Sequence, residues 1–181
     1  MQKEHPDIEL TFNASCTHKI MQGLKNPSMD AGYMFGAIED EAITGYELDV
    51  ADLVITAPAA WKDQVAEAGW KEIAALPWIG SSYYCPFQTA AEKLFKKRKL
   101  TMNHVVWMDD EFNKCALVEA GVGLALLERS EAEQAALGGK IFIWKTEPIK
   151  CKLSWVYLRN RGDDPLIAAL TAEVLNIWGK A

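Results

Sequence analysis

Hydrophobic and polar positions change their spacing along the 181 residues of this chain, and each spacing predicts one kind of element. Apolar residues at every second position are typical of a strand, whereas apolar residues three and four positions apart line one side of a helix. Over the first sixty residues these patterns predict, in order, a strand at Asp7 to Phe12, a helix at His18 to Lys25, a strand at Asp30 to Phe35 and an extended run within Gly45 to Ala57.

From Ala68 onward, predicted helices and strands alternate. Helices are predicted at 68–75, 86–98 and 110–120, with a further helix opened by the capping-box spacing of Ser130 to Glu133. Strands are predicted at 78–80, 104–107, 122–127, 140–145 and 153–158. A last helix follows, because Asp163 and Asp164 suit its N-cap, Pro165 suits its first turn and an apolar stripe runs to Trp178.

This alternation predicts an α/β protein with a mostly parallel sheet. We expect two lobes rather than one domain. Residues 1–60 together with 146–181 would form the first lobe, and residues 61–145 the second.

Composition narrows the function classes. Half of the residues are hydrophobic, 24% are charged and the net charge is −6, so the chain is a poor candidate for binding nucleic-acid phosphates by itself. The one cationic run, Lys96 to Lys99, falls at a predicted helix end, where it complements the helix dipole. No apolar run reaches the roughly 18 residues of a membrane span, and the polar start does not suit a signal peptide.

Metal, cofactor and catalytic motifs are not evident. The four cysteines are scattered without zinc or redox spacing, which favours reduced thiols in a cytoplasmic protein. Cys16 and His18 lie two positions apart at a helix start, point in different directions and have no orienting third group. Gly121 and Gly123 follow a helix and precede a strand, the reverse of a dinucleotide-binding order. We therefore expect no cofactor, no metal and no enzyme activity.

Two polar turns are the candidate ligand site. Ser81, Ser82, Tyr83, Tyr84 and Cys85 lie between a predicted strand and a helix that starts at Pro86. Such turns gather at the carboxyl ends of parallel strands, and the free N–H groups of a helix start favour a carboxylate or another polar ligand group. The alternative is a capped turn that binds only water.

The second turn, Met108-Asp109-Asp110, occupies the equivalent position one βα unit later. An aspartate at a helix start is commonly an N-cap, and this turn needs no further role.

The motifs HPDIELTF, DAGYMFG, SSYYCPF and VEAGVGLALL, together with the strand that ends at Pro58, resemble the effector-binding domain of LysR-type transcriptional regulators over essentially the whole chain. The resemblance implies the fold of type 2 periplasmic binding proteins: two Rossmann-like lobes joined by two crossover segments, with a small effector between them. It implies effector contacts from the first turn (Asn13, Ser15 and Thr17) and from the later turns (Ser81, Ser82, Tyr83, Cys85, Met108 and Asp109). For Ser15 or Thr17, a helix N-cap is an equally good interpretation.

The chain differs from the family pattern at several points, among them Glu128, where the family often has proline. We expect an N-terminal winged helix-turn-helix to be absent, and the first lobe to lack its first strand. Asp109 stands where many family members have a neutral polar residue. If Asp109 faces the cleft, a purely anionic effector becomes less plausible and one with an amine more so.

The resemblance also implies a homodimer that contacts DNA only through the absent N-terminal domain. The alternative function is a stand-alone solute-binding protein of a transport system, against which the lack of a signal sequence and the four unpaired cysteines argue. The upstream reading frame would distinguish the two functions.

Overall fold

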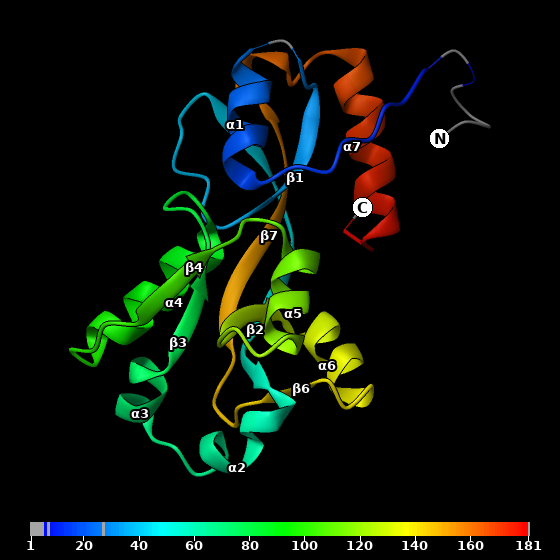
Figure 1. Cartoon of the computed structure of the whole chain (residues 1–181). Coiled ribbons are helices and arrows are strands. Elements are labelled where there is room, and N and C mark those ends of the chain that lie inside the picture. The colour runs from blue at the N-terminus through cyan, green and yellow to red at the C-terminus, as the bar shows by residue number, and fades with distance from the viewer. Residues whose placement is uncertain (1–5, 7, 27, 181) are drawn as a thin grey trace. The chain divides into compact units, whose positions relative to one another are not determined.

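The computed structural model describes residue 6, residues 8–26 and residues 28–180 (Figure 1). The chain forms two compact units. Unit 1 contains the described residues up to Val50 and from Lys152 on, and unit 2 runs from Ala51 to Cys151. Two long strands, β2 (Ile43–Pro58) and β7 (Ile149–Leu158), contribute residues to both units.

Unit 1 combines a small sheet with one helix on each face. Its other elements are α1 (Thr17–Lys25), β1 (Ala31–Phe35), the 3-10 turn η2 (Arg159–Arg161) and α7 (Pro165–Ile177). The strand order is β1-β7-β2, and β1 pairs with β7 in the antiparallel direction, with Ala31 opposite Tyr157.

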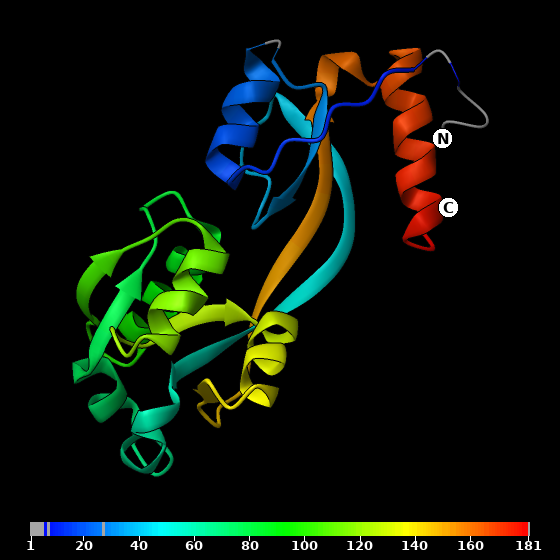
Figure 2. The ribbon, with the colours of Figure 1, turned by 45° about the vertical axis from the view of Figure 1, so that its right-hand side comes forward.

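The alternation of side chains along β7 explains why each helix of unit 1 has its own face of the sheet. Val156 packs in one cluster with Leu24 of α1. Its neighbours Trp155 and Tyr157 point the other way and pack with Ile167 of α7. Figures 1 and 2 show α1 and α7 on opposite sides of these strands.

Unit 2 holds the predicted succession of helices and strands, together with two short elements at 59–61 and 62–65 that the spacing did not predict. Its elements are η1 (Ala59–Trp61), α2 (Lys62–Val65), α3 (Trp70–Ala75), β3 (Pro77–Gly80), α4 (Pro86–Lys97), β4 (Asn103–Trp107), α5 (Glu111–Glu119), β5 (Ala125–Glu128), α6 (Arg129–Leu137) and β6 (Ile141–Ile143). None of the helices in the described part of the chain is long and apolar enough to cross a membrane.

The strands of unit 2 pair in both directions and belong to two sheets: β3 and β4 form one, and β2, β5 and β6 belong to the other. Strand β3 pairs in parallel with β4, and a parallel bridge joins Trp78 to Leu124 beside β5. Strand β2 pairs in the antiparallel direction with both β5 and β6. The prediction of a mostly parallel sheet is therefore wrong for these pairs and for β1 with β7. Parallel pairing needs a crossover helix, which α4 and α5 supply, whereas β2 enters the sheet from unit 1 in the opposite direction.

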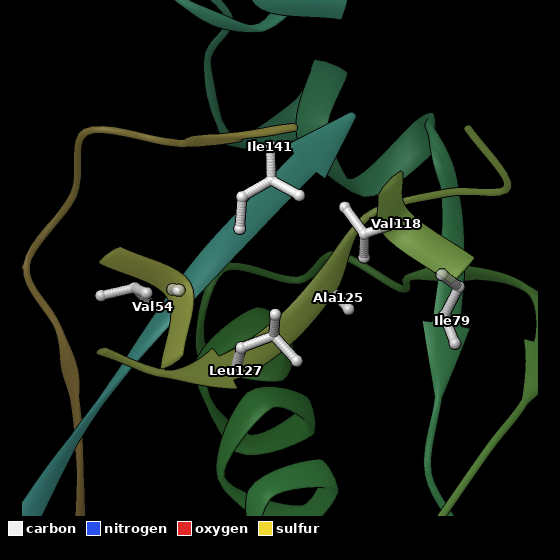
Figure 3. Packing of buried hydrophobic residues seen from close by; sticks show 7 residues of the cluster. Val54, Ile79, Val118, Ala125, Leu127 and Ile141 are labelled. Carbon is white, nitrogen blue, oxygen red and sulfur yellow. The ribbon is translucent and has the colours of Figure 1, made fainter. Parts of the chain in front are cut away.

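Apolar side chains pack on both sides of β3. On one face, residues of β2, β3, β5, β6 and α5 form a cluster, which Figure 3 shows as Val54, Ile79, Val118, Ala125, Leu127 and Ile141. On the other face, the indole ring of Trp78 meets Phe95 of α4 edge to face, with 5.3 Å between ring centroids. The Trp78 Nε1–H donates to the Ile73 carbonyl of α3 at 2.8 Å. The strand that carries the first polar turn is thus held from both sides.

Several local predictions need correction. No strand forms over residues 8–12, and Asp7 lies outside the described residues. An alternating pattern gains nothing without a neighbouring strand, and Phe12 remains exposed. The N-cap of α1 is Cys16, so neither Ser15 nor Thr17 caps it. The N-cap of α6 is Glu128, whose carboxylate accepts from the Ser130 N–H, so the predicted capping box is wrong as well.

The glycines of the VEAGVGLALL motif have structural roles. Gly121 has φ 83° at the end of α5, where its N–H donates to the Val118 carbonyl at 3.0 Å. Gly123 lies against β3, and a Cβ atom there would be 2.6 Å from the Pro77 carbonyl oxygen. The first glycine turns the chain and the second lets two backbones approach, so the motif builds the sheet.

We expect Gly123→Ala to lower the free energy of unfolding by about 1–3 kcal/mol, because the clashing atom belongs to the backbone and cannot rotate away. Urea denaturation would measure the change. Gly162→Ala is the matched control, since its Cβ would have no neighbour closer than 3.5 Å. Equal effects of the two substitutions would contradict this explanation.

Candidate functional site

Two polar turns lie side by side at the carboxyl ends of β3 and β4. The first, Ser81 to Cys85, connects β3 to α4, and the second, Met108 to Asp110, connects β4 to α5. Because β3 and β4 are parallel neighbours, both turns leave the same edge of the sheet. The Met108 N–H donates to the Gly80 carbonyl at 2.9 Å, and the Ser82 N–H donates to Asp109 Oδ1 at 2.6 Å. These bonds tie the two turns together.

An open hollow of about 350 Å³ lies over the joined turns. Its lining residues are Ser82, Tyr83, Trp107, Met108 and Asp109. Four of them are predicted site residues, and Trp107 is an addition. The alternation along β4, which leaves the end residue of the strand exposed beside a polar turn, is the signal that could have identified Trp107.

The ring of Trp107 is held in position by the imidazole of His104. The two rings stack, with 4.6 Å between centroids and 26° between the planes. A Cβ atom at Gly80 would lie 2.8 Å from both rings, so only glycine leaves room for this stack. The residue is nevertheless 58% exposed, which leaves the indole accessible to a ligand.

The surroundings of the His104 imidazole, the second ring of this stack, favour its neutral form. Burial lowers the pKa of His104, while the Glu92 carboxylate acts in the opposite direction. The Nε2 atoms of Gln88 and His104 lie 3.1 Å apart. Since an amide nitrogen can only donate, the ring nitrogen accepts this bond.

Beneath the first turn lies a buried polar network that sequence reasoning did not find. The Ser81 N–H donates to Gln88 Oε1 at 3.0 Å, and the Lys114 ammonium donates to the Ser81 hydroxyl. Ser81 and Lys114 are each 2% exposed, and together with Gln88 they line a cavity of about 10 Å³, the size of one water molecule. Ser81 therefore lies under the hollow and not in its lining.

The free N–H groups expected in the first turn are largely occupied. Those of Ser81 and Ser82 donate to side chains, and that of Cys85 donates to the Ser82 carbonyl at 2.9 Å. These three N–H groups are therefore not free for a carboxylate or another polar ligand group, and a ligand contact through this turn stays a prediction. Cys85 is the N-cap residue of α4 and does not line the hollow.

The start of α5 carries a half-buried carboxylic acid. Glu111 lies near the charged groups of Glu131, Lys114, Glu128 and Asp110. Burial raises the pKa of Glu111 to about 7, and the negative charge of Glu131 contributes the next largest increase. Its Oε1 atom is buried without a hydrogen-bond partner among the described residues. Asp110 is the N-cap, as its sequence position suggests, and accepts from the Asn113 N–H at 2.8 Å.

The three site residues predicted in the first sixty residues belong to unit 1. Asn13 and Ser15 are exposed in a segment without regular structure, and Thr17 starts α1. The Thr17 hydroxyl donates to the Phe35 carbonyl at 3.3 Å. A role for these three residues in effector binding stays a prediction.

Metal binding has no suitable cluster of side chains in the part of the chain that the structure describes. Within it, no group of three or more histidine, cysteine, aspartate or glutamate side chains is arranged to hold a metal ion. Cys16, Cys85 and Cys115 are free thiols.

Comparisons with known proteins place this geometry in a family. The family model for the LysR substrate binding domain matches residues 1–178. A comparison with curated proteins gives no match.

Solved structures share the fold at low sequence identity. The CcmR regulatory domain of Synechocystis PCC6803 in complex with 2-PG is 13% identical, with a TM-score of 0.81 over 97% of this chain and 86% of that one. The effector binding domain of QuiR in complex with shikimate is 17% identical, with a TM-score of 0.80 over 98% and 85%. Full-length CbnR complexed with target DNA is 14% identical, with a TM-score of 0.71 over 99% and 64%.

These matches confirm the predicted α/β fold of the type 2 periplasmic binding proteins. The family model covers nearly the whole chain. This chain belongs to the LysR substrate binding domain family.

Proposed function

We propose that this domain senses a small metabolite for a LysR-type transcriptional regulator and that the hollow of unit 2 supplies effector contacts. The observation that carries this proposal is the pair of turns joined through Ser82 and Asp109 beneath a hollow of about 350 Å³. This volume suits a small ligand, and parallel sheets bind ligands at this edge. The CcmR and QuiR domains, which share the fold, are in complex with 2-PG and shikimate.

The effector acts through differential affinity. A ligand that prefers one arrangement of the domain shifts the population toward it and thereby biases the DNA-bound states of the full regulator. The family match supports this function over a transport solute-binding protein, and it supports a regulatory rather than a catalytic role.

The expected partners follow the same reasoning. In this proposal the regulator is cytoplasmic, contacts DNA through a winged helix-turn-helix segment outside this sequence, and dimerises through the present domain. Light scattering at micromolar concentration should give twice the monomer mass. A monomer alone would contradict the dimer and leave the effector proposal standing.

A thermal-shift screen over metabolites tests the function. A true effector at 100 times its Kd should stabilise the domain by about 2.7 kcal/mol, and Trp107→Leu should weaken that response because the indole lines the hollow. Phe112→Leu is the control, since Phe112 is also an exposed aromatic residue and does not line the hollow. A screen in which no metabolite stabilises the domain would contradict the proposal.

A further inference from the structure

We infer that the hollow of unit 2 takes an organic cation: a small molecule whose ammonium group lies between the Asp109 carboxylate and the Trp107 ring. This inference rests on the proposed function and names the chemical class of the effector. It is carried by the charge, the aromatic surface and the hydrogen bonds of the lining residues.

The charge of the lining has one sign. Among its five residues Asp109 alone has a carboxyl side chain, and none has a basic side chain. The nearby cation, Lys114, is buried beneath the first turn and donates to Ser81, so it does not line the hollow. The chain as a whole carries a net charge of −6, which also favours the approach of cations.

The aromatic surface suits a cation as well. Trp107 and Tyr83 line the hollow and are 58% and 80% exposed. The face of an indole ring attracts an ammonium group, and tryptophan is the strongest of the aromatic residues in this respect. The stack on His104 holds the ring in place before a ligand arrives, which lowers the entropy cost of binding. Met108 adds a polarizable apolar contact for the body of the ligand.

The hydrogen bond between the turns acts against an anion. Asp109 Oδ1 accepts from the Ser82 N–H, which is a donor that a ligand carboxylate at this turn would otherwise use. A carboxylate ligand would meet the Asp109 charge and lose this donor. An ammonium group can instead donate to the carboxylate, whose second oxygen lies outside that bond.

Three probes that share a benzyl group test the inference: benzylammonium, benzyl alcohol and phenylacetate. Isothermal titration should show that benzylammonium binds at least about 10-fold more tightly than phenylacetate, with benzyl alcohol between them. Asp109→Asn should reduce that ratio by about 10-fold, because the amide oxygen can still accept the Ser82 N–H while the charge is gone. Asp63→Asn, which removes the same charge from an exposed site of unit 2 outside the hollow, should leave the ratio unchanged.

Two further variants separate charge from aromatic contact. Trp107→Leu should weaken benzylammonium several-fold, and Phe112→Leu should not. The inference is overturned if phenylacetate binds as tightly as benzylammonium, if Asp109→Asn keeps the ratio, or if no probe binds. A metabolite that is neutral or anionic and whose binding depends on Trp107 would overturn the cation inference while supporting the proposed function.

Discussion

Replacing Trp78 by alanine is expected to lower the free energy of unfolding by about 3–5 kcal/mol. The side chain is 2% exposed, and its ring meets Phe95 edge to face. The substitution leaves a large cavity and removes the donor to the Ile73 carbonyl, which is bound at 2.8 Å. Because Trp78 lies on β3, the strand that carries the first polar turn, ligand binding should weaken together with stability.

Trp107→Ala is the matched control for this experiment, since it deletes the same side chain from the neighbouring strand. The residue is 58% exposed and its ring stacks on His104, so the expected cost is no more than about 1 kcal/mol. Urea denaturation of both variants measures the difference. Similar losses would contradict the view that Trp78, and not Trp107, anchors this edge of the sheet.

Glu111→Gln is expected to stabilise the domain by about 3 kcal/mol above pH 7 and to remove most of a pH dependence between pH 4.5 and 7. Burial raises the pKa of Glu111 from 4.5 to about 7 in the folded state. Between these values the folded state holds a proton that the unfolded state has released, so stability falls as pH rises. Below pH 4.5 both states are protonated and the penalty vanishes, whereas above pH 7 it is complete.

Three of the four charged groups around Glu111 raise its pKa, as burial does. Glu131, Glu128 and Asp110 raise its pKa, and the Lys114 ammonium lowers it. Urea denaturation at several pH values should give a declining stability profile for the original sequence and a flatter one for Glu111→Gln. Glu72→Gln, at an exposed position in α3, should keep the original profile. An unchanged decline in Glu111→Gln would show that another group controls the pH dependence.

Periodicity predicted most elements of unit 2 closely, because the spacing of apolar residues along the chain is enough to form one apolar face on a helix or strand. The helix predicted at 86–98 is α4, Pro86–Lys97, and the strand predicted at 104–107 is β4, Asn103–Trp107. The strand predicted at Asp7 to Phe12 does not form over the described residues 8–12, since pairing depends on a neighbour that spacing does not report.

One part of the candidate site could be predicted from the sequence and another part could not. Its two turns follow from the order of strand, polar loop and helix, so Ser82, Tyr83, Met108 and Asp109 could be named in advance. The contributions of Gln88 and Lys114 could not be predicted. The sequence does not show that Lys114 is buried, because the group that accepts its hydrogen bond, Ser81, lies 33 positions away.

By itself, the sequence determined the family, the α/β class and the positions of the polar turns, because these depend on local spacing and on motifs in order. Only the tertiary structure decided which strands run antiparallel, that Trp107 completes the hollow, and that Asp109 occupies the Ser82 N–H. The physical reason is that hydrogen bonds and packing between distant segments depend on the three-dimensional course of the chain, whereas periodicity records only the faces of single elements.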